Sequence, residues 1–330
     1  MSRRSVLCRL VITSLVATVA IAQQIADPNF DTRVASPAFR DRHPSVLLDE
    51  AHFNSHTADG TYKPFVDLIT SDGYIVHINR RLFSSQGLER YDILVIAGAL
   101  GTKRYTDPDA ARSAFTVNEQ HVVAAWVRGG GGLLIMGDHP PFGSAVADLL
   151  SRFDIEYSGG YTIDTSPDNR LERSIHTLVF SRQNGLLGDS PLTNGRDVSE
   201  HVERVVTFTG NSFKAPSGSL TFLHVSPTGW EVFAHRPVGT IERFKSPPQG
   251  LMLRPPVPAA GRAQGVAVRF GKGRIVVVGD GALLSAQLVG EDREPKGWNW
   301  PGNDTRQLTL NIMHWLSGLL DTPLDGANRP

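Results

Sequence analysis

Two short, uninterrupted apolar runs place the strongest constraint on the fold of this chain. They are Ile93-Leu94-Val95-Ile96 and Leu133-Leu134-Ile135-Met136. A strand with one face in water alternates apolar and polar residues, whereas these runs contain no polar position. They therefore predict strands that are buried on both faces, as in a parallel sheet covered by helices on both sides.

Helical patterns separate the apolar runs. A helix is expected over residues 62–71, where Phe65, Leu68 and Ile69 share one face, and another is expected from a capping box at Thr116 and Glu119 to about Arg128. Further helices are expected at 142–153 and 304–319, with strands at 46–48, 74–78, 91–97 and 133–136 and a hairpin at 264–270 and 274–278. Strand alternating with helix predicts an α/β fold with a doubly wound, mostly parallel sheet.

Composition distinguishes three regions of the chain, and one of them contains an insertion. Residues 1–22 resemble a signal peptide, residues 45–320 are expected to form one α/β domain, and residues 321–330 are expected to be a disordered tail. Within the domain, residues 155–262 contain short β-like runs such as 205–208 and 220–223 between Gly, Pro, Ser and Thr, which predicts a strand-rich insertion. The proline-rich part of it, residues 246–258, is expected to be a loop.

The amino-terminal segment predicts export. Three arginines without an acid precede 13 almost wholly apolar residues, and the small residues before Gln23 suit cleavage there. An uncleaved anchor is the alternative, but a membrane-spanning helix needs about 20 apolar residues. We therefore expect a periplasmic or secreted protein without a transmembrane segment after cleavage. The pair Arg3-Arg4 leaves open whether export follows the twin-arginine or the general route.

Cysteine content and charge exclude several classes of function. The only cysteine, Cys8, lies in the leader, so the mature chain has neither a disulfide nor a thiol nucleophile. Without the three leader arginines, the 33 basic residues fall to 30 against 33 acidic ones. This balance does not predict a nucleic-acid-binding protein, which needs a concentrated basic surface.

Three predicted strands end in an acid: Asp49 with Glu50, Asp138 with His139, and Asp280. The carboxyl ends of parallel strands share one rim of the sheet, and ligands bind at that rim in open α/β folds. We therefore expect these carboxylates to approach one another. The alternative is that Asp138 and Asp280 only cap the helices that follow.

The densest polar segment follows the first of these strands. Val46–Thr57 holds Asp49, Glu50, His52, Asn54 and His56. Imidazole and carboxylate together form a common ligand set for divalent metals, although the spacing is not that of a His-Glu-x-x-His zinc motif. A divalent metal is one hypothesis, with the ligand pool Asp49, His52, His56, Asp138 and His139; no cofactor follows with certainty.

A second polar cluster, residues 297–304, precedes the last helix. Asn303 or Asp304 can cap that helix, which is one interpretation. The other is a lip for carbohydrate, in which Trp298 and Trp300 stack on a sugar and Asn299 binds its hydroxyl groups.

Several motifs are absent from the sequence. It has no Gly-x-Ser-x-Gly elbow, no phosphate loop that ends in Gly-Lys-Ser/Thr and no Gly-x-Gly-x-x-Gly after the first strand. A serine hydrolase, a nucleoside triphosphatase and a Rossmann dehydrogenase are therefore disfavoured.

The order of four segments resembles a bacterial family of unknown function. The segments are Asp49-Glu50-Ala51-His52 with His56-Thr57, the run from Gly60 to Phe65, the run from Gly137 to Gly143, and Asn303-Asp304 through Asn311 to Leu316. The family is similar to class I glutamine amidotransferase-like domains and, more distantly, to domains of gliding-motility and intraflagellar-transport proteins. The resemblance covers residues 45–320. It implies a flavodoxin-like, amidotransferase-like fold more than an activity.

The resemblance also limits the chemistry. Amidotransferases of this fold use a cysteine at a strand-to-helix elbow, and the corresponding turn here, Gly137 to Gly143, has Asp138 and His139 instead. Cysteine-dependent glutamine hydrolysis is therefore not expected. Several relatives of the fold are thought to bind sugars or proteins without catalysis.

Three functions remain after these exclusions. The first is binding of a small polar molecule, for which a glycan is the leading candidate, at the carboxyl rim. The expected ligand-binding residues are Asp49, Glu50, His52, Asn54, His56, Asp138, His139, Asp280, Asn299 and Asn303. The second is a metal-dependent hydrolase whose catalytic candidates are Glu50, Asp138, His139 and Asp280. The third is an interaction module in the cell envelope, with protein partners that the sequence does not identify.

Overall fold

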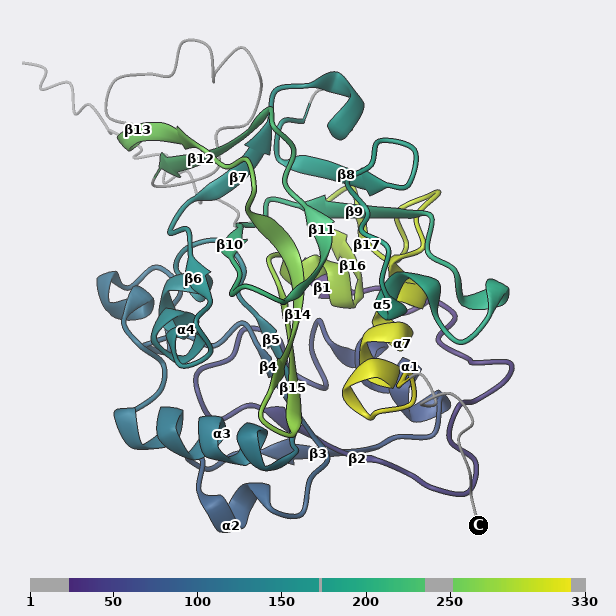
Figure 1. Ribbon diagram of the computed structural model, residues 1–330. Helices are drawn as coiled ribbons and strands as arrows, with labels where there is room; N and C mark the ends of the chain where they lie inside the picture. The colour runs from purple at the N-terminus through teal and green to yellow at the C-terminus, as the bar shows by residue number, and fades with distance from the viewer. Residues whose placement is uncertain (1–23, 172–173, 235–251, 322–330) are drawn as a thin grey trace, which may run out of the picture.

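A nine-stranded sheet with helices on both faces forms the centre of the molecule (Figure 1). The computed structural model describes residues 24–171, 174–234 and 252–321. The predicted leader, residues 246–251 of the predicted loop and residues 322–330 of the predicted tail lie outside these ranges.

The first five strands of the sheet run parallel in the order β3-β2-β4-β5-β15. Their bounds are β2 (Ser45–Asp49), β3 (Ile75–Asn79), β4 (Ile93–Ala97), β5 (Gly132–Met136) and β15 (Gly273–Val278). If these five parallel strands are numbered 1 to 5 along the chain, their order in the sheet is 2-1-3-4-5, which is the order of flavodoxin-like folds. The predicted doubly wound α/β fold with a mostly parallel sheet is therefore confirmed.

Burial explains why the central strands are apolar throughout. Every residue of β4 and β5 is buried, and helices cover both of their faces. On one face, Phe65 of α1 (Lys63–Ser71) and Leu308 of α7 (Thr305–Leu316) pack on the sheet. On the other face, the sheet contacts α2 (Ser85–Leu88), α3 (Val117–Gly129) and α4 (Phe142–Ser151). Figure 1 shows these two groups of helices on opposite sides of the sheet.

The helix ends follow local sequence signals. The capping box predicted at Thr116 forms: its hydroxyl accepts from the Glu119 amide, and the Glu119 carboxylate accepts from the Thr116 amide. α3 ends at Gly129, and the next residue, Gly130, has a φ of 131°, which suits glycine. α7 ends earlier than predicted because Gly318 adopts a φ of 83°, which breaks the helix.

The sheet continues beyond β15 with antiparallel strands. β14 (Ala263–Phe270) forms the predicted hairpin with β15 and also pairs with β11 (Leu220–His224). The path then ends with β10 (Phe213–Lys214) and β6 (Glu156–Tyr157). Part of residues 155–262 thus extends the main sheet itself.

The rest of residues 155–262 forms two small sheets. One has the order β13-β12-β7, with β7 (Tyr161–Asp164), β12 (Gly229–Ala234) and β13 (Met252–Pro258), and the other joins β8 (Thr177–Ser181) to β9 (Arg204–Phe208). A loop was predicted over residues 246–258, but residues 252–258 form strand β13. Its prolines are tolerated because β13 is an edge strand that pairs on one side only.

Short elements complete the chain. A third small sheet joins β1 (Gln24–Ala26), β16 (Ala286–Val289) and β17 (Glu294–Gly297). The other helices of the described residues are α5 (Pro191–Asn194) and the 3-10 turns η1 (Pro108–Ala111), η2 (Pro167–Asn169), η3 (Val198–Glu200) and η4 (Gly281–Leu284). Asp321, the first residue of the predicted tail, pairs with Arg269 and Arg274.

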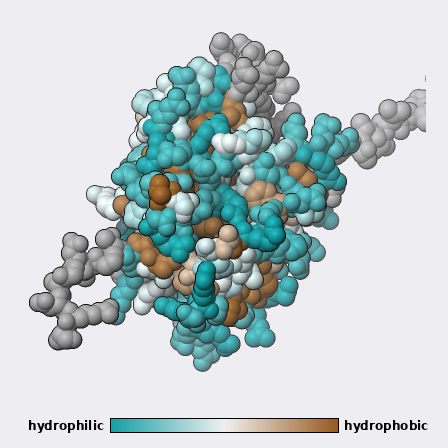
Figure 2. Space-filling model, turned by 90° about the vertical axis from the view of Figure 1, so that its right-hand side faces the viewer, coloured by the Kyte–Doolittle hydropathy of each residue, from teal (hydrophilic) through white to brown (hydrophobic). Residues whose placement is uncertain are grey.

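The surface is mostly hydrophilic on the face that Figure 2 presents, where apolar patches are small and separate. Among the described residues, no helix has both the length and the apolar character to cross a bilayer.

Candidate functional site

The carboxyl ends of the parallel strands bring Asp138 and Asp280 together. β5 and β15 are neighbours in register, with Met136 opposite Val278, and both aspartates lie two residues beyond their strand ends. Oδ2 of Asp138 accepts a hydrogen bond from the Gly281 amide at 3.0 Å, directly after Asp280. The two acids therefore meet across adjacent strands, as the sequence predicted for the common rim.

Asp280 also caps the 3-10 turn η4, which was the alternative interpretation of this residue. One of its oxygens accepts from the Ala282 amide at 2.8 Å, and the other accepts from the Phe208 amide at the end of β9. The carboxyl group is almost completely buried, with 1% of the residue exposed. Asp280 thus ties the main sheet to the small sheet formed by β8 and β9.

Burial and charge change the protonation of this pair. Loss of solvation and, to a lesser extent, the charge of Asp138 raise the pKa of Asp280 to about 7, against the opposing effects of Lys296 and of the backbone amides of Phe208 and Ala282. Asp280 is therefore partly protonated near neutral pH.

His56 is the third titratable group of this site. Its Nδ1 lies 2.6 Å from the Thr61 hydroxyl, and its ring packs on Tyr62 at 4.8 Å between ring centroids. Burial lowers the pKa of His56 to about 4, with Asp138 acting in the opposite direction. The imidazole is consequently neutral at pH 7.

Gly281 fills the space between these groups. A Cβ atom at this position would lie 2.8 Å from Asp138 Oδ2, His56 Nε2 and Met136 Sδ. The Tyr62 hydroxyl donates to the Gly281 carbonyl at 2.9 Å from the opposite side. Glycine is therefore needed here for close packing of the site.

Aromatic rings surround the Asp138-His139 turn. His139 stacks on Tyr161 at 5.2 Å between centroids and contacts Phe142, which stacks on Tyr105. Tyr105 is 48% exposed, so this row of rings extends from the buried pair to solvent. Burial and the charge of Asp138 raise the pKa of Tyr105.

Local bonds hold the turn from Gly137 to Gly143. It connects β5 to α4 and contains a cis peptide bond between Pro140 and Pro141. His139 Nδ1 bonds the Pro140 carbonyl at 2.8 Å, and the His139 amide donates to Asp138 Oδ1 at 2.6 Å. The backbone amide and imidazole of His139 are thus fixed by local bonds.

Asp49 lies in a separate network, which corrects the expectation that all three acids meet. β4 separates β2 from β5, and two strand spacings amount to about 10 Å. Oδ2 of Asp49 binds His52 Nδ1 at 2.8 Å, and Oδ1 accepts from Asn79 at 2.9 Å. The carboxylate is completely buried.

His52 is held between two carboxylates. Its Nε2 lies 2.9 Å from Glu119 Oε1, opposite the contact with Asp49, and its ring packs between Phe83 and Phe115. Burial lowers the pKa of His52, but the two carboxylates outweigh burial and the net shift is upward. The sequence indicated Glu119 only as part of a helix cap. Its contact with His52 joins residues 67 positions apart, and no sequence motif indicates that contact.

The other residues of the Asp49–Thr57 segment shape its loop. Glu50 accepts from the Ala58 amide at 2.9 Å and pairs with Arg80 at 3.3 Å. Asn54 accepts from the His52 amide and donates to the Ala97 carbonyl. Of the five polar residues predicted here, only His56 reaches the Asp138–Asp280 site. Among the described residues, no group of three or more His, Asp or Glu side chains is arranged to hold a metal ion.

A pocket of about 530 Å³ is lined by Phe208, Lys296 and Trp300 together with polar residues of the β8 and β17 regions. Trp300 packs on Phe208 edge to face at 5.6 Å between centroids, and both contact the buried cluster that includes Ala282. The backbone amide of Phe208 donates to Asp280, so one residue joins the pocket to the acid pair.

The predicted polar cluster, residues 297–304, has two roles: most of its side chains hold the local fold, and one lines the pocket. Trp298 is buried, and its indole N–H donates to the Leu283 carbonyl at 3.0 Å. Asn299 donates to Asp27 and to the Gln287 carbonyl, and Asn303 accepts from the Thr305 amide at the start of α7. Only Trp300 lines the pocket; Phe208, Lys296, Tyr62, Tyr105 and Tyr161 were not identified from the sequence.

Comparison with known proteins supports the fold. No protein-family model matches the sequence, and no curated protein matches it significantly. Among solved structures, the "mmIFT52 N-terminal domain" is similar over 83% of this chain and 97% of its own length, with a TM-score of 0.55 and 12% identity.

Two further structures are similar at lower scores. A putative ThuA-like protein from Bacteroides uniformis shares 12% identity over 86% of this chain and 93% of its own, with a TM-score of 0.40. A putative GMP synthase subunit from Thermoplasma acidophilum shares 9% identity over 85% of this chain and 97% of its own, with a TM-score of 0.39. At these identities the likeness concerns the fold and not the activity.

Proposed function

We propose that this chain is a periplasmic or secreted binding protein with an amidotransferase-like fold, and that it binds a polar ligand, a neutral glycan, at the carboxyl rim of its sheet. We propose this role for the chain as a member of the bacterial family of unknown function that its sequence resembles. The amidotransferase-like fold supports a ligand at this rim, because open α/β sheets bind ligands beyond the carboxyl ends of their strands.

The main support is the pocket between Trp300, Phe208 and Lys296 beside the Asp138–Asp280 pair. An aromatic face buries the apolar face of a sugar, while carboxylate, ammonium and hydroxyl groups bind its hydroxyls. The pocket provides both kinds of group, since Ser174, Thr177 and Glu294 also line it. Its volume of about 530 Å³ lies within the usual range of small-molecule sites.

The buried acids suit positioning better than attack on a substrate. Both oxygens of Asp280 accept backbone amides, and both oxygens of Asp138 accept backbone amides as well. We infer that the pair fixes the wall of the pocket, and that ligand contacts come from Trp300, Lys296 and the polar residues that line the pocket.

A panel of neutral oligosaccharides tests the proposal. Thermal-shift screening of the full chain should identify binders, and titration calorimetry should give their affinities. Trp300→Ala should weaken binding about tenfold or more, because it removes the stacking face. Trp126→Ala is the matched control, since Trp126 is similarly half-buried but lies on α3 and should leave the affinity unchanged.

Two results would count against the proposal. If no oligosaccharide raises the melting temperature, a glycan is excluded as the ligand. If the Trp300→Ala protein binds with the same affinity as wild type, this pocket is excluded as the binding site. Asp138→Ala should also reduce the affinity through loss of the bond to the Gly281 amide.

Export has its own test. Expression of the full chain in a Gram-negative host should give a periplasmic protein whose first residue is Gln23. A cytoplasmic protein that still begins at Met1 would contradict the proposed localisation.

A further inference from the structure

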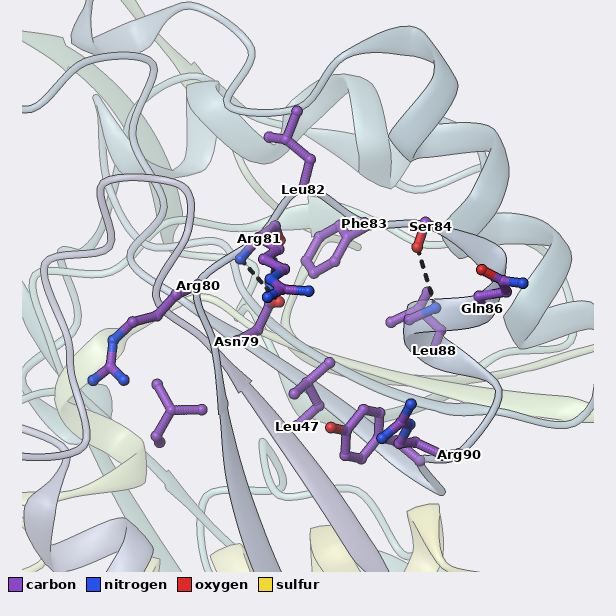
Figure 3. Close-up of a pocket in the computed structure, with 13 residues that line it drawn as sticks. Leu47, Asn79, Arg80, Arg81, Leu82, Phe83, Ser84, Gln86, Leu88 and Arg90 are labelled. Atoms are coloured by element: carbon purple, nitrogen blue, oxygen red, sulfur yellow. Dashed lines mark hydrogen bonds between the residues drawn. The ribbon is translucent and has the colours of Figure 1, made fainter.

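A second pocket lies between the edge strand β3 and helix α2, away from the acid pair (Figure 3). Its volume is about 480 Å³. The apolar part of its lining includes Leu47, Phe83 and Leu88, which belong to the core cluster under α2. The exposed part includes Leu82, which is 65% exposed.

Three arginines contribute the charge of this pocket, and none of its 13 lining residues is acidic. Arg80 pairs with Glu50 at 3.3 Å. The guanidinium groups of Arg81 and Arg90 form neither an ion pair nor a hydrogen bond with any described residue. Figure 3 shows Arg80 pointing away from the other two, with Phe83 and Leu88 near Arg81 and Arg90. Two cationic groups thus remain available to a ligand.

The segment that bears Arg81 is anchored at both ends. The Asn79 amide group donates to Asp49 Oδ1 at 2.9 Å and to the Arg81 carbonyl at 2.8 Å, and its oxygen accepts from the Arg81 amide. The Phe83 amide donates to Glu119 Oε1 at 2.9 Å. Because the two carboxylates are themselves held by His52, the backbone of this segment is ordered before any ligand binds.

We propose that this pocket binds a small organic oxyanion with an apolar or aromatic body. Guanidinium groups bind phosphate and carboxylate through paired N–H donors, and the apolar lining accommodates the body of the ligand. The volume lies within the range of small-molecule sites. The pocket shares no lining residue with the Trp300 pocket, so the site is independent of the proposed glycan binding.

Calorimetric titration of the full chain with phenyl phosphate tests this site. Saturable binding is expected, and Arg81→Gln and Arg90→Gln should each weaken it about tenfold, because each removes a charge-assisted contact. Arg112→Gln is the matched control: Arg112 is exposed, pairs with Asp109 and does not line the pocket. A second readout is the backbone amide shifts of residues 79–91, which should change on titration.

Further titrants define the ligand. Inorganic phosphate should bind more weakly than phenyl phosphate because it leaves the apolar lining empty, and benzoate should bind if the site accepts carboxylates as well as phosphates. Trp300→Ala should leave the affinity for phenyl phosphate unchanged, which separates this site from the glycan pocket.

Three results would overturn the proposal. They are the absence of saturable binding of phenyl phosphate at millimolar concentration, an unchanged affinity in both arginine variants, and inorganic phosphate binding as tightly as phenyl phosphate. Both arginines are exposed, so the variants should fold, and a melting curve for each verifies this.

Discussion

Replacement of His52 should destabilise the protein more than replacement of any exposed histidine. His52 is 3% exposed and lies 2.8 Å from Asp49 and 2.9 Å from Glu119, so it links the loop after β2 to the start of α3. His52→Leu keeps most of the ring packing against Phe83 and Phe115 but leaves two buried carboxylates without their shared partner.

The magnitude follows from the other bonds of these carboxylates. Removal of one partner of a buried ion pair costs about 3–5 kcal/mol. Asp49 keeps the amide of Asn79, and Glu119 keeps the amides of Phe83 and Thr116, so the loss should lie near the lower limit, about 3 kcal/mol.

Urea denaturation at pH 6 measures this loss as a change in the free energy of unfolding. His77→Leu is the control, because His77 is exposed on the edge strand β3 and should change stability by only about 0.5 kcal/mol. A loss below about 1 kcal/mol in His52→Leu would refute the role assigned to the two carboxylates.

The pH dependence gives a second check. The pKa of His52 is raised from its ordinary 6.5, so its contribution is complete below pH 6.5 and is lost as the pH rises through the folded value. Burial raises the pKa of Glu119, but its hydrogen bonds outweigh burial and lower it from 4.5, so that contribution is complete above pH 4.5 and is lost in acid. The difference between wild type and His52→Leu should therefore be greatest between pH 4.5 and 6.5.

Three further predictions concern the core of the site and its support. Asp138→Asn should lower the pKa of Asp280 below about 7, because it removes a neighbouring negative charge; carbon-13 NMR titration of the carboxyl group measures this, and an unchanged pKa would contradict the coupling. Gly281→Ala should destabilise the protein, since the new Cβ meets three atoms at 2.8 Å, and a melting temperature equal to that of wild type would show that the site is less tightly packed. Asn311→Ala should cost about 2 kcal/mol in urea denaturation, because Asn311 is buried and donates to the carbonyls of Leu192 and Glu200; a cost near zero would mean that water replaces it.

The parallel part of the fold could be predicted because its signals are local. The continuous apolar runs at 93–96 and 133–136 match β4 and β5, and the capping box at Thr116 marks the start of α3. The small sheets were harder to predict, because Gly, Pro, Ser and Thr interrupt the apolar patterns of their short strands. β13 pairs with β12 in spite of its prolines, since it needs hydrogen bonds on one side only.

The site could be predicted only in part, because the order of strands within the sheet differs from their order along the chain. Asp138 and Asp280 meet because β5 and β15 are neighbours, whereas β4 separates Asp49 from them. The motif residues that resemble the bacterial family have structural roles as well: His314 Nε2 lies 2.7 Å from Asp72 Oδ2 in the core. The polar residues of these motifs thus indicated hydrogen-bonded networks, but the sequence did not show which residues would belong to the same network.

A crystal structure of the protein soaked with the oligosaccharide that gives the largest thermal shift tests the central claim most directly. We predict density for a sugar ring stacked on Trp300, within hydrogen-bonding distance of Lys296 and beside the Asp138–Asp280 pair. Density bound elsewhere, with the pocket lined by Trp300, Phe208 and Lys296 filled only by water, would contradict the claim that the carboxyl rim is the ligand site.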